Sequence, residues 1–389
     1  MYKTKLLLKT ILLLLSFNAI AKPVTVEEER LEKATLAMPE AIKVFSGKIN
    51  QFSQAYKTVK NYQEAKEVIH THGQQLWLMA KTNTQTSSII DDRPLYWSRL
   101  SGSKIIREGS LKFSPTKLQL SALITLFEKG TRGQLDLEFT KSTNKKILLT
   151  GFDPFLLDKN INQSNPSGIA ALKLDGQVIS YKGVTAEINT VMIPVRYKDF
   201  DDGIIESLLA PYYALNNVDM IVTVSMGREE FDLERFPGKR RSVTAPDNLN
   251  ILSGGTNEKP IVSKLYNQPL PGNEFVLFSL PVKQMQTVKG PYKVIDNHKV
   301  TSIDESLMPK KVEPHTLSQL DGHVAVSGSG GGYLSNEISY RSIRLRNQLN
   351  SNIPTGHIHT PRIEQFEPKV EEKIVRQIKA MLERSLVAI

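Results

Sequence analysis

The stretch Asp321-Gly-His-Val-Ala-Val-Ser-Gly-Ser-Gly-Gly-Gly-Tyr-Leu-Ser-Asn-Glu-Ile-Ser339 joins a short apolar run to a glycine-rich turn and then to a pattern of helical period. It predicts a strand over 323–327 and places Ser335 where the next helix begins. Backbone N–H groups are unpaired at a helix N-terminus, and the helix dipole there favours negative charge. Ser335 therefore has the placement of a nucleophile with oxyanion donors beside it. Spacing alone also fits an ordinary helix N-cap.

The chain beyond Lys145 alternates short apolar runs with segments of helical period. Strands are expected at 146–150, 190–195, 218–224, 323–327 and 357–359, and helices at 168–174, 201–209 and 368–386. Such alternation favours a mostly parallel sheet covered on both faces. The predicted fold class is α/β: a three-layer α/β/α sandwich with a mostly parallel twisted sheet, preceded by a smaller, mainly helical N-terminal region.

Three segments are predicted: a signal peptide at 1–21, an N-terminal mainly helical region at 22–140, and an α/β domain at 141–389. Helical spacing dominates from Val24 to Lys81, whereas 95–100 and 134–139 have the pattern of strands. Trp77, Tyr96 and Trp97 fit core or interface anchors better than a ligand cage. No role for residues 22–140 follows from the sequence.

The first 21 residues have the features of a secretory signal. Three lysines precede an apolar core, and Ala19-Ile20-Ala21 forms a small-residue cleavage site. The apolar core is too short for a membrane span, and no later run of sufficient length appears. The expected location is therefore periplasmic or secreted after cleavage near Ala21.

Composition fits an exported chain. It has no cysteine among 389 residues, and an oxidising compartment is one in which a lone reactive thiol would be lost. The formal charge of +10 falls to +7 without the signal, which carries three lysines and no acid. The positive residues are scattered and form no basic stripe with interleaved aromatics, so nucleic-acid binding is not expected.

Four blocks of residues, in this order, resemble the pyroglutamyl peptidase I family, also called pyrrolidone-carboxylate peptidases. They are Thr150-Gly151-Phe152-Asp153-Pro154-Phe155 with Asn165-Pro166-Ser167; Gly227-Arg228 and Leu233-Glu234-Arg235 with Pro246-Asp247-Asn248; the turn leading to Ser335; and Gly356-His357-Ile358-His359-Thr360-Pro361. The resemblance covers roughly 145–389. It implies the same α/β/α architecture and peptides with N-terminal pyroglutamate as substrates.

Carried over position by position, the family's catalytic Glu falls on Glu234 and its catalytic His on His359. The catalytic Cys falls on Ser335. By the same resemblance, Phe152 and Phe155 sandwich the pyroglutamyl ring and Asn165 holds the loop that shapes the pocket; plain core packing is the alternative for the two phenylalanines. The loop at Gly227 contributes to substrate binding. No cofactor and no metal is implied, and the oligomeric state, including a homo-oligomer, is left open.

Two functions remain open from the sequence. One is an exported pyroglutamyl-peptidase-like aminopeptidase acting through an acyl-enzyme on Ser335, with His359 as base and Glu234 as its orienter. The other is a pseudoenzyme that binds pyroglutamyl ends or acts as a scaffold, because a hydroxyl is harder to activate than a thiol. A metal site on His357 and His359 is a distant third, since no further ligands complete it.

The signal predicts that the mature chain begins at Lys22 and lies outside the cytoplasm. Amino-terminal sequencing of the native protein should return Lys-Pro-Val-Thr. Recovery of an intact Met1 from a cytosolic fraction would contradict this prediction.

Overall fold

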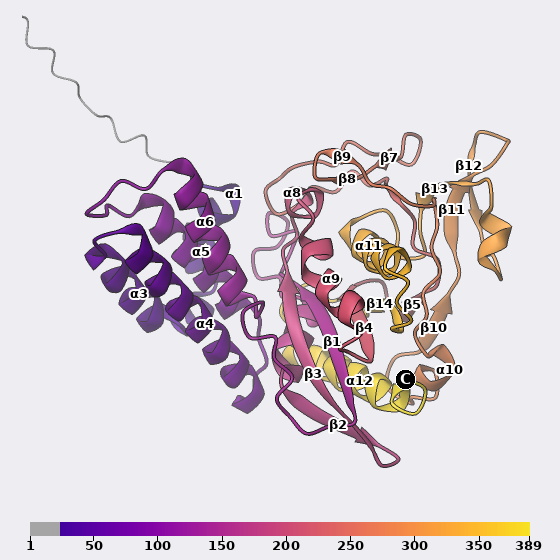
Figure 1. Cartoon of the computed structure of the whole chain (residues 1–389), viewed down its shortest axis with the longest axis horizontal. Helices are drawn as coiled ribbons and strands as arrows, with labels where there is room; N and C mark the ends of the chain where they lie inside the picture. The colour runs from indigo at the N-terminus through magenta and orange to yellow at the C-terminus, as the bar shows by residue number, and fades with distance from the viewer. Residues whose placement is uncertain (1–23) are drawn as a thin grey trace, which may run out of the picture.

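The computed structural model describes residues 24–389, so the predicted signal segment lies outside the described residues. The first part of the chain is helical and forms a bundle beside the sheet-containing part (Figure 1). Its helices are α1 (Val26–Ala37), α2 (Pro39–Lys43), α3 (Ser46–Thr58), α4 (Tyr62–Thr86), α5 (Arg93–Glu108) and α6 (Lys117–Thr131). Capping boxes at Thr25 and Thr116 start α1 and α6 by satisfying N–H groups that the helix itself leaves unpaired. None of the helices described is long and apolar enough to span a bilayer.

Two strand predictions in this region are wrong. Residues 95–100 lie inside α5, which begins with Pro94 in its first turn and is buried on almost every side. Residues 95–100 are all buried, so they show no division into an apolar and a polar face of helical period. Residues 134–139 form an irregular connection between α6 and the sheet.

A seven-stranded sheet forms the centre of the second part, in the order β10-β5-β14-β4-β1-β3-β2. Strands β3, β1, β4 and β14 are mutually parallel, β2 runs antiparallel to β3, β5 runs antiparallel to β14, and β10 is parallel to β5. The strands are β1 (Lys145–Phe152), β2 (Gln177–Tyr181), β3 (Val184–Ile193), β4 (Met220–Met226), β5 (Phe231–Glu234), β10 (Val294–Asn297) and β14 (Thr355–Thr360). The predicted α/β fold with a mostly parallel sheet is confirmed.

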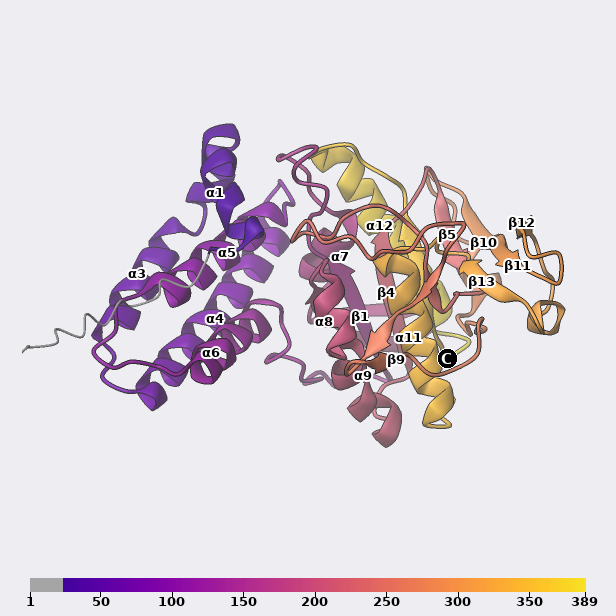
Figure 2. The same cartoon turned by 90° about the horizontal axis from the view of Figure 1, so that it is seen from above.

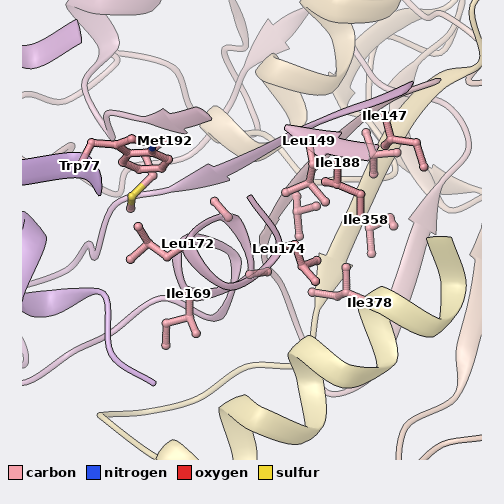
Figure 3. Close-up of a cluster of buried hydrophobic side chains, with 14 of the residues drawn as sticks. Trp77, Ile147, Leu149, Ile169, Leu172, Leu174, Ile188, Met192, Ile358 and Ile378 are labelled. Atoms are coloured by element: carbon pink, nitrogen blue, oxygen red, sulfur yellow. The ribbon is translucent and has the colours of Figure 1, made fainter. Parts of the chain in front are cut away.

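Helices cover both faces of this sheet. On one side lie α7 (Pro166–Leu174) and α12 (Pro368–Ser385), and on the other α9 (Ile204–Leu215) and α11 (Leu334–Gln348). Successive side chains of β1 point to opposite faces of the sheet and so enter two different cores. Ile147 and Leu149 join the cluster of α7 and α12, whereas Leu148 joins that of α9 and α11. Figure 3 shows the first cluster, in which Trp77 of α4 lies next to Met192. The helical bundle thus shares a core with the sheet, and Figure 2 shows it beside α7.

The helix expected at 201–209 is divided in two. A short α8 (Tyr197–Asp201) precedes α9, and Gly203 lies between them with φ of 79°. That left-handed conformation favours glycine and breaks the helix.

The strand predicted at 323–327 exists but belongs to another sheet. It is β13 (Val324–Ser327), the partner of β11 (Val300–Ile303), which also pairs with β12 (Pro309–Val312). This three-stranded antiparallel sheet stands beside the main one. The remaining short elements are β6 (Arg240–Arg241), β7 (Ile261–Val262), β8 (Lys264–Leu265), β9 (Gln268–Pro269), α10 (Val282–Met285) and the 3-10 turn η1 (Leu317–Leu320).

Two buried acids lie where α5, α7 and α12 meet. The carboxylate of Asp92 accepts the backbone N–H of Asn165, and the hydroxyl of Ser164 donates to Glu371. Burial raises the pKa of Glu371 to about 8 and that of Asp92 well above its usual value. The second carboxylate oxygen of Glu371 is buried and lacks a partner among the described residues, which disfavours its ionisation further.

Glu371→Gln should remove a loss of stability that develops between about pH 5 and pH 8. A raised carboxyl pKa favours the folded state at low pH and ceases to do so as pH rises through the folded pKa. Glutamine keeps an acceptor for Ser164. Urea unfolding should show the variant gaining on the order of 1–3 kcal/mol over wild type between these pH values.

Glu372→Gln is the matched control, because Glu372 is exposed and pairs only with Arg376 of its own helix. Its free energy of unfolding should track wild type at both pH values. A constant difference between Glu371→Gln and wild type across the range would contradict the prediction.

Candidate functional site

A cavity of about 1140 Å³ opens at the carboxyl ends of β1, β4 and β14. This is the edge at which ligands bind in open α/β sheets. Six of the seven predicted site residues line it: Phe152, Phe155, Asn165, Gly227, Ser335 and His359. The seventh, Glu234, is fully buried and contacts His359.

His359 and Glu234 come from β14 and β5, which lie side by side in the sheet. Nδ1 of His359 is 2.5 Å from Oε1 of Glu234. Burial raises the pKa of Glu234, and the neighbouring His359 opposes that rise. A carboxylate at Nδ1 favours the tautomer with its proton on that nitrogen, which leaves Nε2 able to accept a proton.

Asn297 holds the other oxygen of the same carboxylate, and sequence reasoning missed it. Its Nδ2 lies 3.0 Å from Oε2 of Glu234 and 2.9 Å from the backbone oxygen of Ser329. One buried amide thus joins the acid to the glycine-rich loop. Asn297 ends β10, between the motif blocks that end at Asn248 and begin at the turn leading to Ser335, so no motif indicated it.

Ser335 is the second residue of α11, whose N-cap is Tyr333. The N-cap interpretation of Ser335 is therefore wrong. No side chain caps this helix, so the N–H groups of Leu334 and Ser335 have no intrahelical partner. The side chain of Asn336 fixes the helix start through both backbone groups of Gly238, at 2.9 Å and 2.7 Å.

The hydroxyl of Ser335 donates to the backbone oxygen of Gly330 at 3.2 Å. The roles that the resemblance implies require one hydrogen-bonded chain from Ser335 through His359 to Glu234, and the structure has the His359–Glu234 part of it. Gly330 itself lies against the imidazole, since a Cβ added there would be 3.4 Å from Cε1 of His359. Ser335 would have to leave the Gly330 carbonyl before it could donate to Nε2.

Gly227 lines the cavity, but its N–H is engaged within the fold. Its N–H donates to the backbone oxygen of Thr360 at 2.9 Å, so it does not serve as an oxyanion donor in this arrangement. A Cβ at this position would lie 2.5 Å from Cβ of His359. Glycine is required at position 227 because the chain after β4 lies directly against the side chain of His359 in the neighbouring strand β14.

Aromatic side chains form one wall of the cavity. Phe152 is almost fully buried and lies parallel to Phe200 at a centroid distance of 6.3 Å. Phe155 is half-buried and lies 6.4 Å from Tyr333. Each predicted phenylalanine thus lines the cavity while packing on another ring. Tyr333 was not singled out from the sequence, although it precedes Ser335 by two residues.

Asn165 fixes the loop between β1 and α7. Its Nδ2 donates to the backbone oxygen of Asp153 at 2.9 Å, and its Oδ1 accepts the N–H of Ser167. It caps α7 and at the same time closes the loop that carries Phe152 and Phe155.

His357 is engaged on both ring nitrogens. Nδ1 lies 2.7 Å from Oγ1 of Thr223, and Nε2 lies 2.7 Å from Oγ of Ser225. Burial, followed by the neighbouring His359, lowers its pKa well below the usual value. His357 is therefore a neutral, hydrogen-bonded core residue beneath His359.

Gly227→Ala should displace the His359 ring from Glu234, because no space exists for a Cβ. Overpacking of this kind costs about 1–3 kcal/mol, measured as the free energy of unfolding in urea. The NMR signals of the His359 imidazole should shift. Gly47→Ala is the control: Gly47 is an exposed helical position with nothing near its Cβ, so the change should be neutral or stabilising by up to about 1 kcal/mol. Unchanged His359 signals in Gly227→Ala would contradict the steric argument.

Comparison with known proteins supplies relatives for both parts of the chain. The family model described as the PA0049 N-terminal domain matches residues 16–128. The model described as the PA0049 C-terminal domain matches residues 146–277 and 283–364, more than half of the chain. The uncharacterized protein PA0049 of Pseudomonas aeruginosa is 28% identical over 391 residues, which is 78% of this chain and 70% of that protein.

A pyrrolidone-carboxylate peptidase of Clostridium botulinum is 24% identical over 246 residues, covering 62% of this chain and 92% of that enzyme. Among solved structures, a mutant pyrrolidone carboxyl peptidase from Pyrococcus furiosus covers 63% of this chain and 99% of its own, with 22% identity and a TM-score of 0.41. Both parts are thus matched in order along the chain. The chain belongs to the PA0049 family, and its C-terminal domain is distantly related to the pyrrolidone-carboxylate peptidases.

Proposed function

We propose that this protein is an exported hydrolase that removes N-terminal pyroglutamate from peptides. The observation that carries the proposal is the buried pair of His359 and Glu234 at the floor of a cavity that Ser335 also lines. A histidine ordered by a buried carboxylate beside a helix N-terminus is the arrangement that acyl transfer needs. The distant relationship to pyrrolidone-carboxylate peptidases supports pyroglutamyl peptides as the substrate class.

The reaction begins when Ser335 Oγ attacks the carbonyl carbon of the pyroglutamyl residue. His359 Nε2 takes the hydroxyl proton, and Glu234 stabilises the imidazolium that forms. The carbonyl oxygen becomes an oxyanion, which the free N–H groups of Leu334 and Ser335 are placed to bind. His359 then gives its proton to the leaving amine as the peptide bond breaks. Water hydrolyses the ester on Ser335 by the same proton transfers in reverse.

The cavity offers apolar surface suited to a flat, uncharged ring. Phe152, Phe155, Val195 and Tyr333 contribute to this part of its lining. Pyroglutamate has no free amino group, so an apolar wall imposes no cost of burying a charge. The volume exceeds that of one five-membered ring and leaves room for following residues of a peptide.

A pseudoenzyme that binds pyroglutamyl ends is the second candidate, and one observation favours it. The hydroxyl of Ser335 donates a hydrogen bond to the backbone oxygen of Gly330, and within the described residues it makes none to His359. A site without a base-coupled hydroxyl binds ligand but does not acylate. The two candidates differ in turnover and not in binding.

Release of a fluorophore from a pyroglutamyl amide by the mature protein tests the proposal. Ser335→Ala should lower kcat/KM by about a thousandfold or more, because the nucleophile is gone. Pyroglutamyl binding should survive, since the ring contacts other residues. A fluorophosphonate should label Ser335. Ser335→Cys should raise turnover, because a thiolate is stabilised at a helix N-terminus.

Ser339→Ala is the matched control, one turn further along α11 and absent from the cavity lining. It should keep wild-type turnover. Equal, negligible hydrolysis by wild type and Ser335→Ala, with equal binding of a pyroglutamyl peptide, would reject the enzyme and leave the pseudoenzyme. Absence of any binding would reject both.

A further inference from the structure

The helical bundle contacts the loops that form the cavity, and it does so with buried charged side chains. Asp153 lies between the two phenylalanines of the first loop and has no exposed surface. Its carboxylate receives Arg99 of α5 at 2.8 Å and Arg132 at the end of α6 at 2.6 Å. Both arginines are themselves almost fully buried.

The backbone of Asp153 is equally constrained. Its N–H donates to Ile193 at 3.1 Å, and its carbonyl accepts the side chain of Asn165 at 2.9 Å. Every polar group of this residue therefore has a partner in the fold. The chain from Phe152 to Phe155 cannot shift without breaking a contact with the bundle.

The bundle holds the same loop at two more places and also holds the loop at Asn248. Asp92, at the start of α5, accepts the backbone N–H of Asn165 at 3.1 Å. Arg30 of α1 donates to the backbone oxygen of Asn248 at 2.5 Å and pairs with Asp158 at 2.7 Å. The side chain of Asn248 in turn donates to the backbone of Pro154 at 2.9 Å.

We infer that the helical bundle is the positioning element of the substrate pocket, with Arg132, Arg99 and Arg30 as its positioning residues. None of the three lines the cavity. They act through Asp153 and Asn248, which carry the loops that form the aromatic wall. The inference rests on the proposed function where it concerns substrate, but the ordering of the loops does not depend on it.

The chain contains a matched contact that lacks this connection. Lys81 of α4 pairs with Asp175 at 2.9 Å, at the far end of α7. This ion pair also joins the bundle to the α/β part, and neither residue lines the cavity. Lys81→Met therefore weakens the junction without reaching the loops.

The experiment compares Arg132→Met with Lys81→Met in the mature protein. Hydrogen–deuterium exchange of residues 152–166 should become at least about threefold faster in Arg132→Met and stay unchanged in Lys81→Met. With a pyroglutamyl amide, Arg132→Met should raise KM at least about tenfold and change kcat less than about threefold. Arg132→Lys should recover part of the loss, because it restores the charge beside Asp153.

Arg30→Met is the second variant, in case removal of a partner from buried Asp153 prevents folding. Asp158 is 55% exposed, so the loss of Arg30 leaves no buried charge there. The KM of Arg30→Met for the pyroglutamyl amide should rise as it does in Arg132→Met.

Equal exchange rates in the Arg132, Arg30 and Lys81 variants would overturn the inference. A fall in kcat as large as the rise in KM would overturn it as well. Either result would leave only a general stabilising contact between the bundle and the α/β part. Faster exchange in the loops without pyroglutamyl binding by any variant would support the positioning and reject the proposed function.

Discussion

The contact between His359 and Glu234 constrains more of this structure than any other. A fully buried carboxylate must have partners, because removing one partner from a buried charged pair costs about 3–5 kcal/mol. The partners here are His359 and Asn297. To supply them, β5 must lie beside β14, and β10 must lie beside β5. The requirement that buried Glu234 have these two partners therefore determines which strands lie at this edge of the main sheet.

Buried ion pairs also hold α11 in place. Glu337, one turn into α11, accepts Arg241 at 2.6 Å and Arg341 at 2.8 Å, and Arg341 continues to Glu206 of α9. The pairing lowers the pKa of Glu337 and keeps it ionised although it is buried. Arg241 lies in β6, which the loop after Glu234 joins to β5. The same segment of chain thus holds both the acid behind His359 and the helix that carries Ser335, so the two halves of the site cannot move independently.

Local patterns predicted the elements that obey a single period. The apolar run of β1 and the one-sided stripe of α12 were predicted within a residue or two, since each meets a uniform environment along its length. The strand prediction for 95–100 is wrong because these residues of α5 are all buried and show no one-sided apolar stripe. The strand at 323–327 was predicted, but its membership of a second sheet depends on pairing with β11, which local sequence does not encode.

The site residues likewise fall into those that local sequence indicates and those that only the three-dimensional contacts reveal. Glu234 and His359 were found because short motifs surround them, and the structure brings them together across 125 positions of sequence. Asn297 lies in a segment without such motifs, and its role exists only through a contact with a residue 63 positions away. Arg99 and Arg132 act through Asp153, so a reading of the first loop could find the carboxylate but not the cations that neutralise it.

At the position of the proposed nucleophile, serine forms different hydrogen bonds from those of a cysteine. A hydroxyl is a stronger hydrogen-bond donor than a thiol, so the Gly330 carbonyl holds Ser335 more firmly than it would hold a cysteine. A thiolate could form at the helix N-terminus before substrate arrives, whereas a hydroxyl loses its proton only during attack. Turnover by Ser335 therefore requires that a bound substrate favour the rotamer facing His359 over the one facing Gly330. In the proposed reaction the free N–H groups of α11 would provide that preference, by binding the substrate's carbonyl oxygen beside Ser335 and placing the carbonyl carbon within reach of its hydroxyl.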